Sequence, residues 1–171
     1  MKILLKAITF ILIIFVFGCS KTKALPDFNK VEYYSLPEKD TLFERIYEKR
    51  YQNLTALEKE YLEIRDSDNP SSLIDSLKFS KLEKINFRKK TISSNKFDDL
   101  QDIFYSETCS PFTQKACAPI YRDIYIFKNN STVVAIAKVC FECEILYYVD
   151  SKSKWQKSGD CVEFDKLREI K

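Results

Sequence analysis

The cysteines of this 171-residue chain are gathered in its C-terminal part, and this limits its fold more than any other feature. Five of the six stand there, at Cys109, Cys117, Cys140, Cys143 and Cys161. Such a cluster can staple a fold with disulfides, hold a metal with thiolates or exchange electrons as a redox pair. The compartment in which the protein resides largely decides among these outcomes, and the N-terminus indicates that compartment.

The chain begins with the features of an export signal. Lys2 and Lys6 form a short basic region, and an almost wholly apolar run follows over residues 7–17. A basic start, an apolar run of about 7–15 residues and a small residue before the cut are typical of a secretory signal. Fourteen residues separate Lys6 from Lys21. A membrane-spanning helix needs about 20, so this segment is too short to be one.

The segment Val16-Phe17-Gly18-Cys19 resembles the lipobox of bacterial lipoproteins. In that family the cysteine receives a diacylglycerol and becomes the first residue of the mature protein. The resemblance implies that residues 1–18 are a signal peptide and that Cys19 is the lipidation site, bearing acyl chains such as palmitate. Ser20 resembles the residue found in lipoproteins that leave the inner membrane. We therefore expect a bacterial cell-envelope protein that is anchored to the lipid bilayer of the outer membrane, on either its periplasmic or its surface face. The alternative is an uncleaved anchor or an ordinary signal peptide.

Composition excludes several classes of function. Without residues 1–18 the chain keeps 26 basic and 25 acidic residues, a net charge of +1, which argues against a nucleic-acid partner. The chain has no histidine, which excludes Ser-His and Cys-His nucleophile pairs and any histidine-ligated metal. Its two glycines, Gly18 and Gly159, are too few for a phosphate-binding loop or a dinucleotide fingerprint. We expect no catalytic residues, no metal site and no cofactor.

The part before the cysteine cluster is expected to be a tether followed by helices. Residues 19–34 are interpreted as the tether, and residues 35–171 as a single domain whose helical part covers residues 35–106. Ser35–Glu38 and Thr55–Glu58 each fit a capping box, in which the first side chain accepts from a backbone N–H and the glutamate reaches back.

Helical spacing of apolar side chains supports this prediction. Further helices are expected after Ser72 and from Ser94 or Asn95, and residues 85–88 can form a short strand. The first helix is expected to bury one face, made of Leu42, Phe43, Ile46, Tyr47, Tyr51 and Leu54.

The cysteine-rich part over residues 109–171 is expected to be β-structure. Its apolar segments are rich in β-branched and aromatic side chains, as strands are. The expected elements are strands over 121–127, 132–141 and 145–149, turns at Asn129-Asn130 and at 151–154, and a helix over 160–170. The predicted fold class is α+β, with N-terminal helices followed by a C-terminal antiparallel β-hairpin or meander and a short terminal helix.

The segment "VCFECE" places Cys140 and Cys143 three residues apart at the end of a predicted strand. In an exported protein disulfides are the first interpretation. On a continuous strand the two side chains would point to opposite faces, so each would need a distant partner. The predicted hairpin brings Cys143 close to Cys117. Either a Cys117–Cys143 or a Cys117–Cys140 bridge is then expected, and Cys161 can pair with whichever of Cys140 and Cys143 remains. A local Cys109–Cys117 bridge is the competing alternative, and the connectivity stays open.

Two other interpretations of these cysteines stay open. Zinc could be held by the four thiolates of Cys109, Cys117, Cys140 and Cys143, although no glycine or proline shapes a knuckle at Phe141-Glu142. A redox pair of Cys140 and Cys143 is the third interpretation, but neighbouring glutamates should raise a thiol pKa.

The segment "YIFKNNSTVVAIAKVCFEC" resembles small exported proteins of the Bacteroidota in which Ile/Val-Cys-Phe-x-Cys ends a hairpin strand. This resemblance implies a lineage and no activity.

The expected role is non-catalytic binding or structural support in the envelope. A thiol-disulfide redox protein using Cys140 and Cys143 is one alternative. A small inhibitor or immunity-type protein with a protein partner is another. The aromatic residues that could form its binding face, if they are not core packing, are Tyr121, Tyr125, Phe127, Tyr147, Tyr148 and Trp155.

Overall fold

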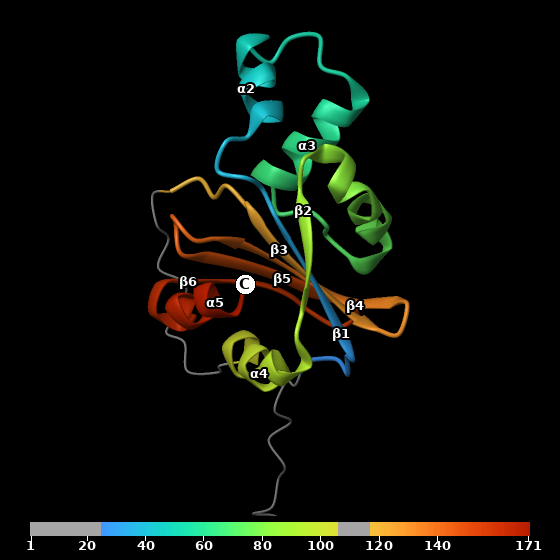
Figure 1. Ribbon diagram of the computed structural model, residues 1–171, viewed down its shortest axis with the longest axis vertical. Helices are drawn as coiled ribbons and strands as arrows, with labels where there is room; N and C mark the ends of the chain where they lie inside the picture. The colour runs from blue at the N-terminus through green and yellow to red at the C-terminus, as the bar shows by residue number, and fades with distance from the viewer. Residues whose placement is uncertain (1–24, 106–116) are drawn as a thin grey trace, which may run out of the picture.

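The computed structural model describes residues 25–105 and 117–171. Its centre is a six-stranded antiparallel sheet with the strand order β2-β1-β3-β4-β5-β6 (Figure 1). The strands are β1 (Lys30–Ser35), β2 (Arg88–Ile92), β3 (Asp123–Asn129), β4 (Thr132–Cys140), β5 (Ile145–Asp150) and β6 (Lys154–Ser158). The strands β3, β4 and β5 form the predicted meander, and β6 extends it by one further strand.

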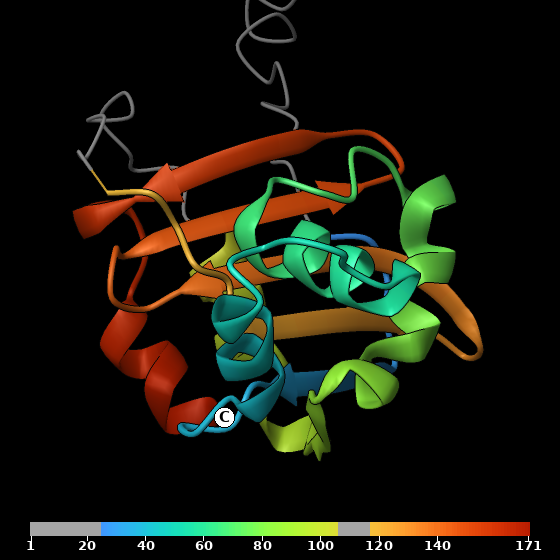
Figure 2. The same cartoon turned by 90° about the horizontal axis from the view of Figure 1, so that it is seen from above.

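Helices cover both faces of this sheet. They are α2 (Thr41–Glu48), α3 (Ala56–Asp66), α4 (Phe97–Tyr105) and α5 (Phe164–Ile170), with 3₁₀ helices η1 (Leu73–Ile85), η2 (Ser94–Lys96) and η3 (Gly159–Cys161). Figure 2 looks from the α2 end, with α2 and α3 nearest the viewer across the strands. The predicted α+β class and the short C-terminal helix are confirmed.

The sheet separates two hydrophobic cores because side chains alternate along each strand. Tyr125 and Phe127 of β3 pack with residues of α4 and α5. Ile124 and Ile126 of the same strand point the other way and pack with α2, α3 and η1. Among the described residues, no helix is long and apolar enough to cross a membrane.

The predicted tether is wrong for its last part. Residues 30–34 belong to β1, which lies between β2 and β3 inside the sheet. Val31 and Tyr33 are buried, and Leu25 already packs into the core beside α4. Both partners of β1 come much later in the chain, so no local signal indicates that this segment is a central strand.

The first helix begins later and ends earlier than predicted. Ser35 is the last residue of β1 and not a helix cap; Asp40 caps α2 by accepting from the Phe43 N–H at 3.3 Å. The helix ends at Glu48, and Tyr51 then adopts a left-handed backbone with φ 59°. Tyr51 thus lies outside the helix and is 49% exposed, and Tyr47 within the helix is 66% exposed, so neither joins the buried face.

Other local predictions hold or shift slightly. The capping box of Thr55 and Glu58 is present at the start of α3. The β3–β4 turn lies at Asn130-Ser131, because Asn129 still pairs with Thr132. The predicted turn at 151–154 is followed by β6, a strand that the sequence reasoning missed.

Candidate functional site

The two cysteines of "VCFECE" lie at the connection between two strands. Cys140 is the last residue of β4 and pairs with Ile145, the first residue of β5, and the intervening residues 141–144 form a turn. Cys143 therefore does not continue the strand, and the expected alternation of faces does not apply to it. Its backbone N–H instead donates to the Cys140 sulfur at 3.4 Å.

The turn is cross-linked to the segment before β3. A disulfide joins Cys143 to Cys117, with 5.9 Å between their Cα atoms, and this is one of the alternative bridges that the sequence left open. Cys161 is half-buried in η3, whereas Cys109 and Cys19 lie outside the described residues. The bridge fixes the position of the turn relative to the start of β3.

Cys140 has little of what a redox cysteine needs. It takes part in no disulfide among the described residues, and its side chain is buried. Burial raises the pKa of the Cys140 thiol, although the backbone N–H groups of Cys143 and Ile120 oppose this. Since the thiolate is the reactive form, a buried thiol with a raised pKa is a poor nucleophile. The described residues also contain no group of three or more cysteines and acids placed to hold a metal.

A pocket of about 480 Å³ opens beside the turn, and we call it the turn pocket. It lies where β1 ends and β3 begins, and the turn supplies part of its wall through Phe141 and Glu142. Its lining residues are Tyr33, Ser35, Leu36, Glu38, Arg122, Asp123, Phe141, Glu142 and Lys171. The Cys117–Cys143 disulfide therefore fixes the turn that forms part of the pocket wall, in addition to cross-linking the fold.

A buried carboxylate lies in the turn pocket. Asp123 is 7% exposed; the Tyr33 hydroxyl donates to its Oδ1, and the Lys171 ammonium lies 3.3 Å from the same oxygen. Burial raises the pKa of Asp123, and the contacts with Tyr33 and Lys171 act in the opposite direction. The pKa of Tyr33 is raised by burial and by the neighbouring Asp123. The group is thus a hydrogen-bonded acid with a cation beside it.

The Phe141 ring adds an aromatic wall to the same pocket. The Lys171 Nζ lies 4.1 Å from its centre and the Arg168 Cζ 5.0 Å from it. Arg168 is held elsewhere as well, by Asp165 at 2.5 Å and by the Phe141 carbonyl at 3.2 Å. Lys171 therefore touches both the buried carboxylate and the aromatic ring.

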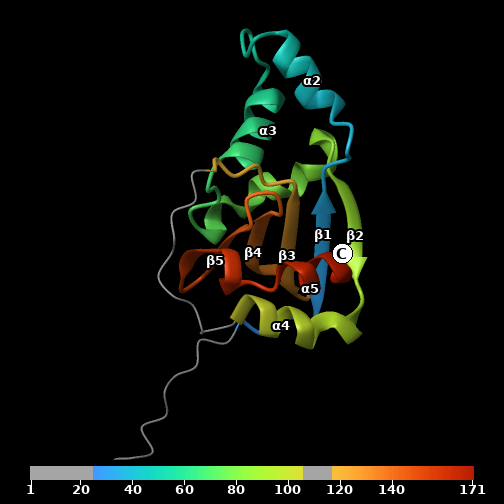
Figure 3. The ribbon, with the colours of Figure 1, turned by 90° about the vertical axis from the view of Figure 1, so that its left-hand side faces the viewer.

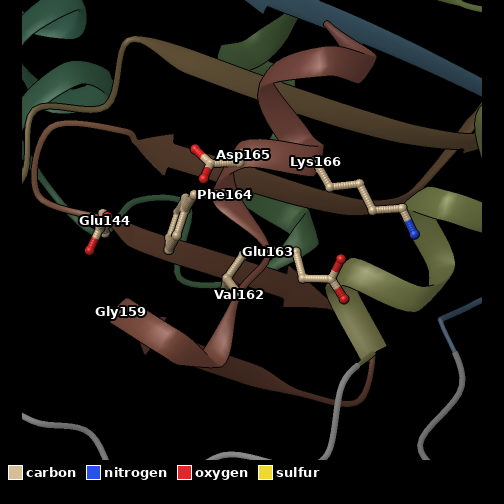
Figure 4. A pocket seen from close by; sticks show the side chains of 7 residues that line it. All are labelled: Glu144, Gly159, Val162, Glu163, Phe164, Asp165 and Lys166. Atoms are coloured by element: carbon tan, nitrogen blue, oxygen red, sulfur yellow. The ribbon is translucent and has the colours of Figure 1, made fainter.

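A second, smaller pocket of about 330 Å³ is lined by Glu144 of the turn and by residues of η3 and α5 (Figure 4). Its Phe164 ring packs edge-on against Phe141, with 6.2 Å between their centres. Figure 4 shows the carboxylates of Glu144, Glu163 and Asp165 directed apart from one another. This pocket does not gather its charges around one point, and the turn pocket is the better candidate site.

The aromatic residues that the sequence offered as a binding face belong to the core. Tyr121, Tyr125, Phe127, Tyr147 and Tyr148 are all at most 3% exposed, and Trp155 stacks on Tyr148 at 4.6 Å. The packing interpretation is therefore confirmed for them. The sequence reasoning missed the residues of the turn pocket, although Asp123, which precedes four apolar residues in the predicted strand "YRDIYIF", was a usable signal.

Comparison with known proteins provides no relative on which to rely. No protein-family model matches the chain, and no curated protein or solved structure matches it.

Proposed function

We propose that this chain is a lipid-anchored protein of the bacterial cell envelope whose domain binds a ligand, without catalysis, in the turn pocket. One observation carries the binding role: a buried carboxylate and an aromatic ring meet at an ammonium group in a pocket with a disulfide-held wall. Perturbed, buried titratable groups in a concave site are common features of ligand sites.

The position of the described N-terminal residues fits such an anchor. Five residues separate Cys19 from Leu25, so an acylated Cys19 would hold the domain within about 20 Å of the bilayer. In Figure 3, β1 begins near α4 and runs toward α2, which lies at the opposite end of the molecule. The α4 end would then face the membrane.

The turn pocket would face away from the anchor. It is lined by Ser35, the last residue of β1, whereas the chain enters the sheet at Lys30. A ligand in the surrounding medium would reach the pocket without passing between the domain and the bilayer.

The anchor is tested by labelling growing cells with an alkyne analogue of palmitate. Wild type should carry the label and sediment with membranes, and Cys19→Ala should do neither. Cys140→Ala is the matched control, because it removes a cysteine without touching the proposed anchor, and it should label like wild type. A label that persists in Cys19→Ala, or an unlabelled wild type, would refute the anchor.

A further inference from the structure

The turn pocket already has the chemistry of a site for an organic ammonium group. Such groups are held over the face of an aromatic ring and beside a carboxylate. Here the ring is Phe141 and the carboxylate is Asp123, and the ammonium of Lys171 lies 4.1 Å from the first and 3.3 Å from the second.

The two partners of this ion pair differ in their exposure. The Lys171 side chain is 34% exposed, whereas that of Asp123 is 9% exposed. The ammonium can therefore leave into solvent by rotation of its own side chain. The carboxylate stays in place, because it lies on β3 and accepts from Tyr33.

The charge of the pocket favours a cation. Asp123, Glu38 and Glu142 contribute three carboxylates, against two cations, Arg122 and Lys171. The Arg122 guanidinium donates to the Pro37 carbonyl at 2.5 Å, which commits it to the pocket rim. The lining is thus net negative even with Lys171 in place, and without Lys171 three carboxylates face one cation and the buried Asp123 lacks the ammonium beside it.

We propose that the turn pocket binds a primary alkylammonium group in the place of Lys171, whose side chain acts as an internal competitor. The inference rests on the proposed function, because it names the ligand class of the same pocket. An anion would face three carboxylates. A guanidinium favours a bidentate pair, but Asp123 Oδ1 already accepts from Tyr33, so a point-like ammonium fits better. A lysine side chain of a protein or a small free amine offers this group.

The test uses the full chain in detergent and n-butylammonium, which matches the four-carbon stem and ammonium of Lys171. Binding is measured by calorimetry to wild type, Lys171→Ala and the control Lys152→Ala, which removes an exposed lysine outside the pocket. If Lys171 fills the site for about nine-tenths of the time, Lys171→Ala should bind about tenfold more tightly than wild type. Lys152→Ala should bind as wild type does.

Two further variants locate the binding. Asp123→Asn and Phe141→Leu, each introduced into Lys171→Ala, should abolish or strongly weaken the binding of n-butylammonium. Two variants are made so that the test still holds if one of them does not fold. Nα-acetyl-lysine N-methylamide binding more tightly than n-butylammonium would identify a lysine side chain as the source, and equal binding would identify a free amine. Equal affinity in wild type and Lys171→Ala, equal binding of neutral n-butanol, or unchanged binding in both folded pocket variants would overturn the inference.

A failed titration can be told apart from a failure of the proposed function. Palmitate labelling tests the anchor independently of any ligand. A panel of neutral and anionic small molecules, followed by chemical shifts of Phe141 and Asp123, tests whether the pocket binds anything else. Binding there without ammonium binding refutes the ligand class alone, and no binding at all refutes the pocket as the site.

Discussion

The ammonium nitrogen of Lys138 lies 4.3 Å from the centre of the Tyr121 ring, and the lysine has no exposed surface. It donates to the backbone carbonyls of Ser67 and of Asn69, the latter at 2.9 Å. The Tyr121 hydroxyl in turn donates to Asp68 at 2.6 Å. These contacts fasten the loop after α3 onto the middle of the sheet.

Lys138 should make stability depend on pH. Burial lowers its pKa to about 7 from 10.5, although the negative charges of Asp68, Asp66 and Glu63 oppose the shift. Between pH 7 and 10.5 the unfolded state binds more protons than the folded state, so stability rises with pH. Below pH 7 Lys138 is charged in the folded state as well, so the free-energy cost of burying that charge reduces the stability in full. From pH 6.5 to 8.5 the free energy of unfolding should increase by about 2 kcal/mol through this group.

Urea denaturation at these two pH values checks this prediction. The increase should be missing in Lys138→Met, which keeps the apolar stem but cannot titrate. Lys154→Met, which removes an exposed lysine from β6, should keep it. An equal pH response in wild type and Lys138→Met would show that Lys138 is not the cause.

Glu32 should protect the fold against acid. Burial alone would raise its pKa, but hydrogen bonds from Lys128, Lys30 and Lys89, at 2.6, 2.8 and 3.0 Å, outweigh it and lower the pKa to about 2. The folded pKa lies below the unfolded value of 4.5, so this stabilisation is complete above pH 4.5 and disappears as the pH falls to 2.

Glu32→Gln should therefore lower the free energy of unfolding at pH 7 by about 1–3 kcal/mol. This figure is smaller than the pKa shift of Glu32 alone would give, because solvent screens the three partly exposed lysines. Urea midpoints at pH 7 and pH 3 provide the measurement, and the difference between variant and wild type should shrink at the lower pH. Glu83→Gln, at an exposed position of η1, should change neither midpoint. A loss of the same size at both pH values would contradict the role of the charge.

The Cys117–Cys143 bridge should contribute to stability. It closes a loop with a sequence separation of 26 residues, for which chain entropy predicts about 3–4 kcal/mol. Cys143→Ser should lose this amount in urea denaturation. Cys140→Ala, which breaks no bridge, should lose about 1 kcal/mol through a small cavity. Equal losses in the two variants would mean that the bridge does not form in solution.

Local signals in the sequence were enough where structure depends on nearby residues. The capping box of Thr55 and Glu58 joins residues three apart, and it is present in the structure. The meander follows from β-rich segments and short turns. β1 was missed because its identity depends on strands β2 and β3, which lie far along the chain.

The pocket was hidden for the same reason. Tyr33, Asp123 and Lys171 are separated by 90 and 48 residues, and only the completed sheet brings them together. The cysteines were informative because disulfide chemistry limits their partners, yet the turn at residues 141–144 had to be seen before the pairing of Cys143 made sense.

The most direct test of the account is the intact mass and peptide map of the protein taken from its native membranes, denatured and thiol-blocked before any reduction. We predict a mature chain that begins at Cys19 with added acyl mass, a blocked Cys140, and no block on Cys117 or Cys143. A full-length chain without acyl mass, in which Cys117 and Cys143 are both blocked, would contradict both the anchor and the disulfide-held pocket.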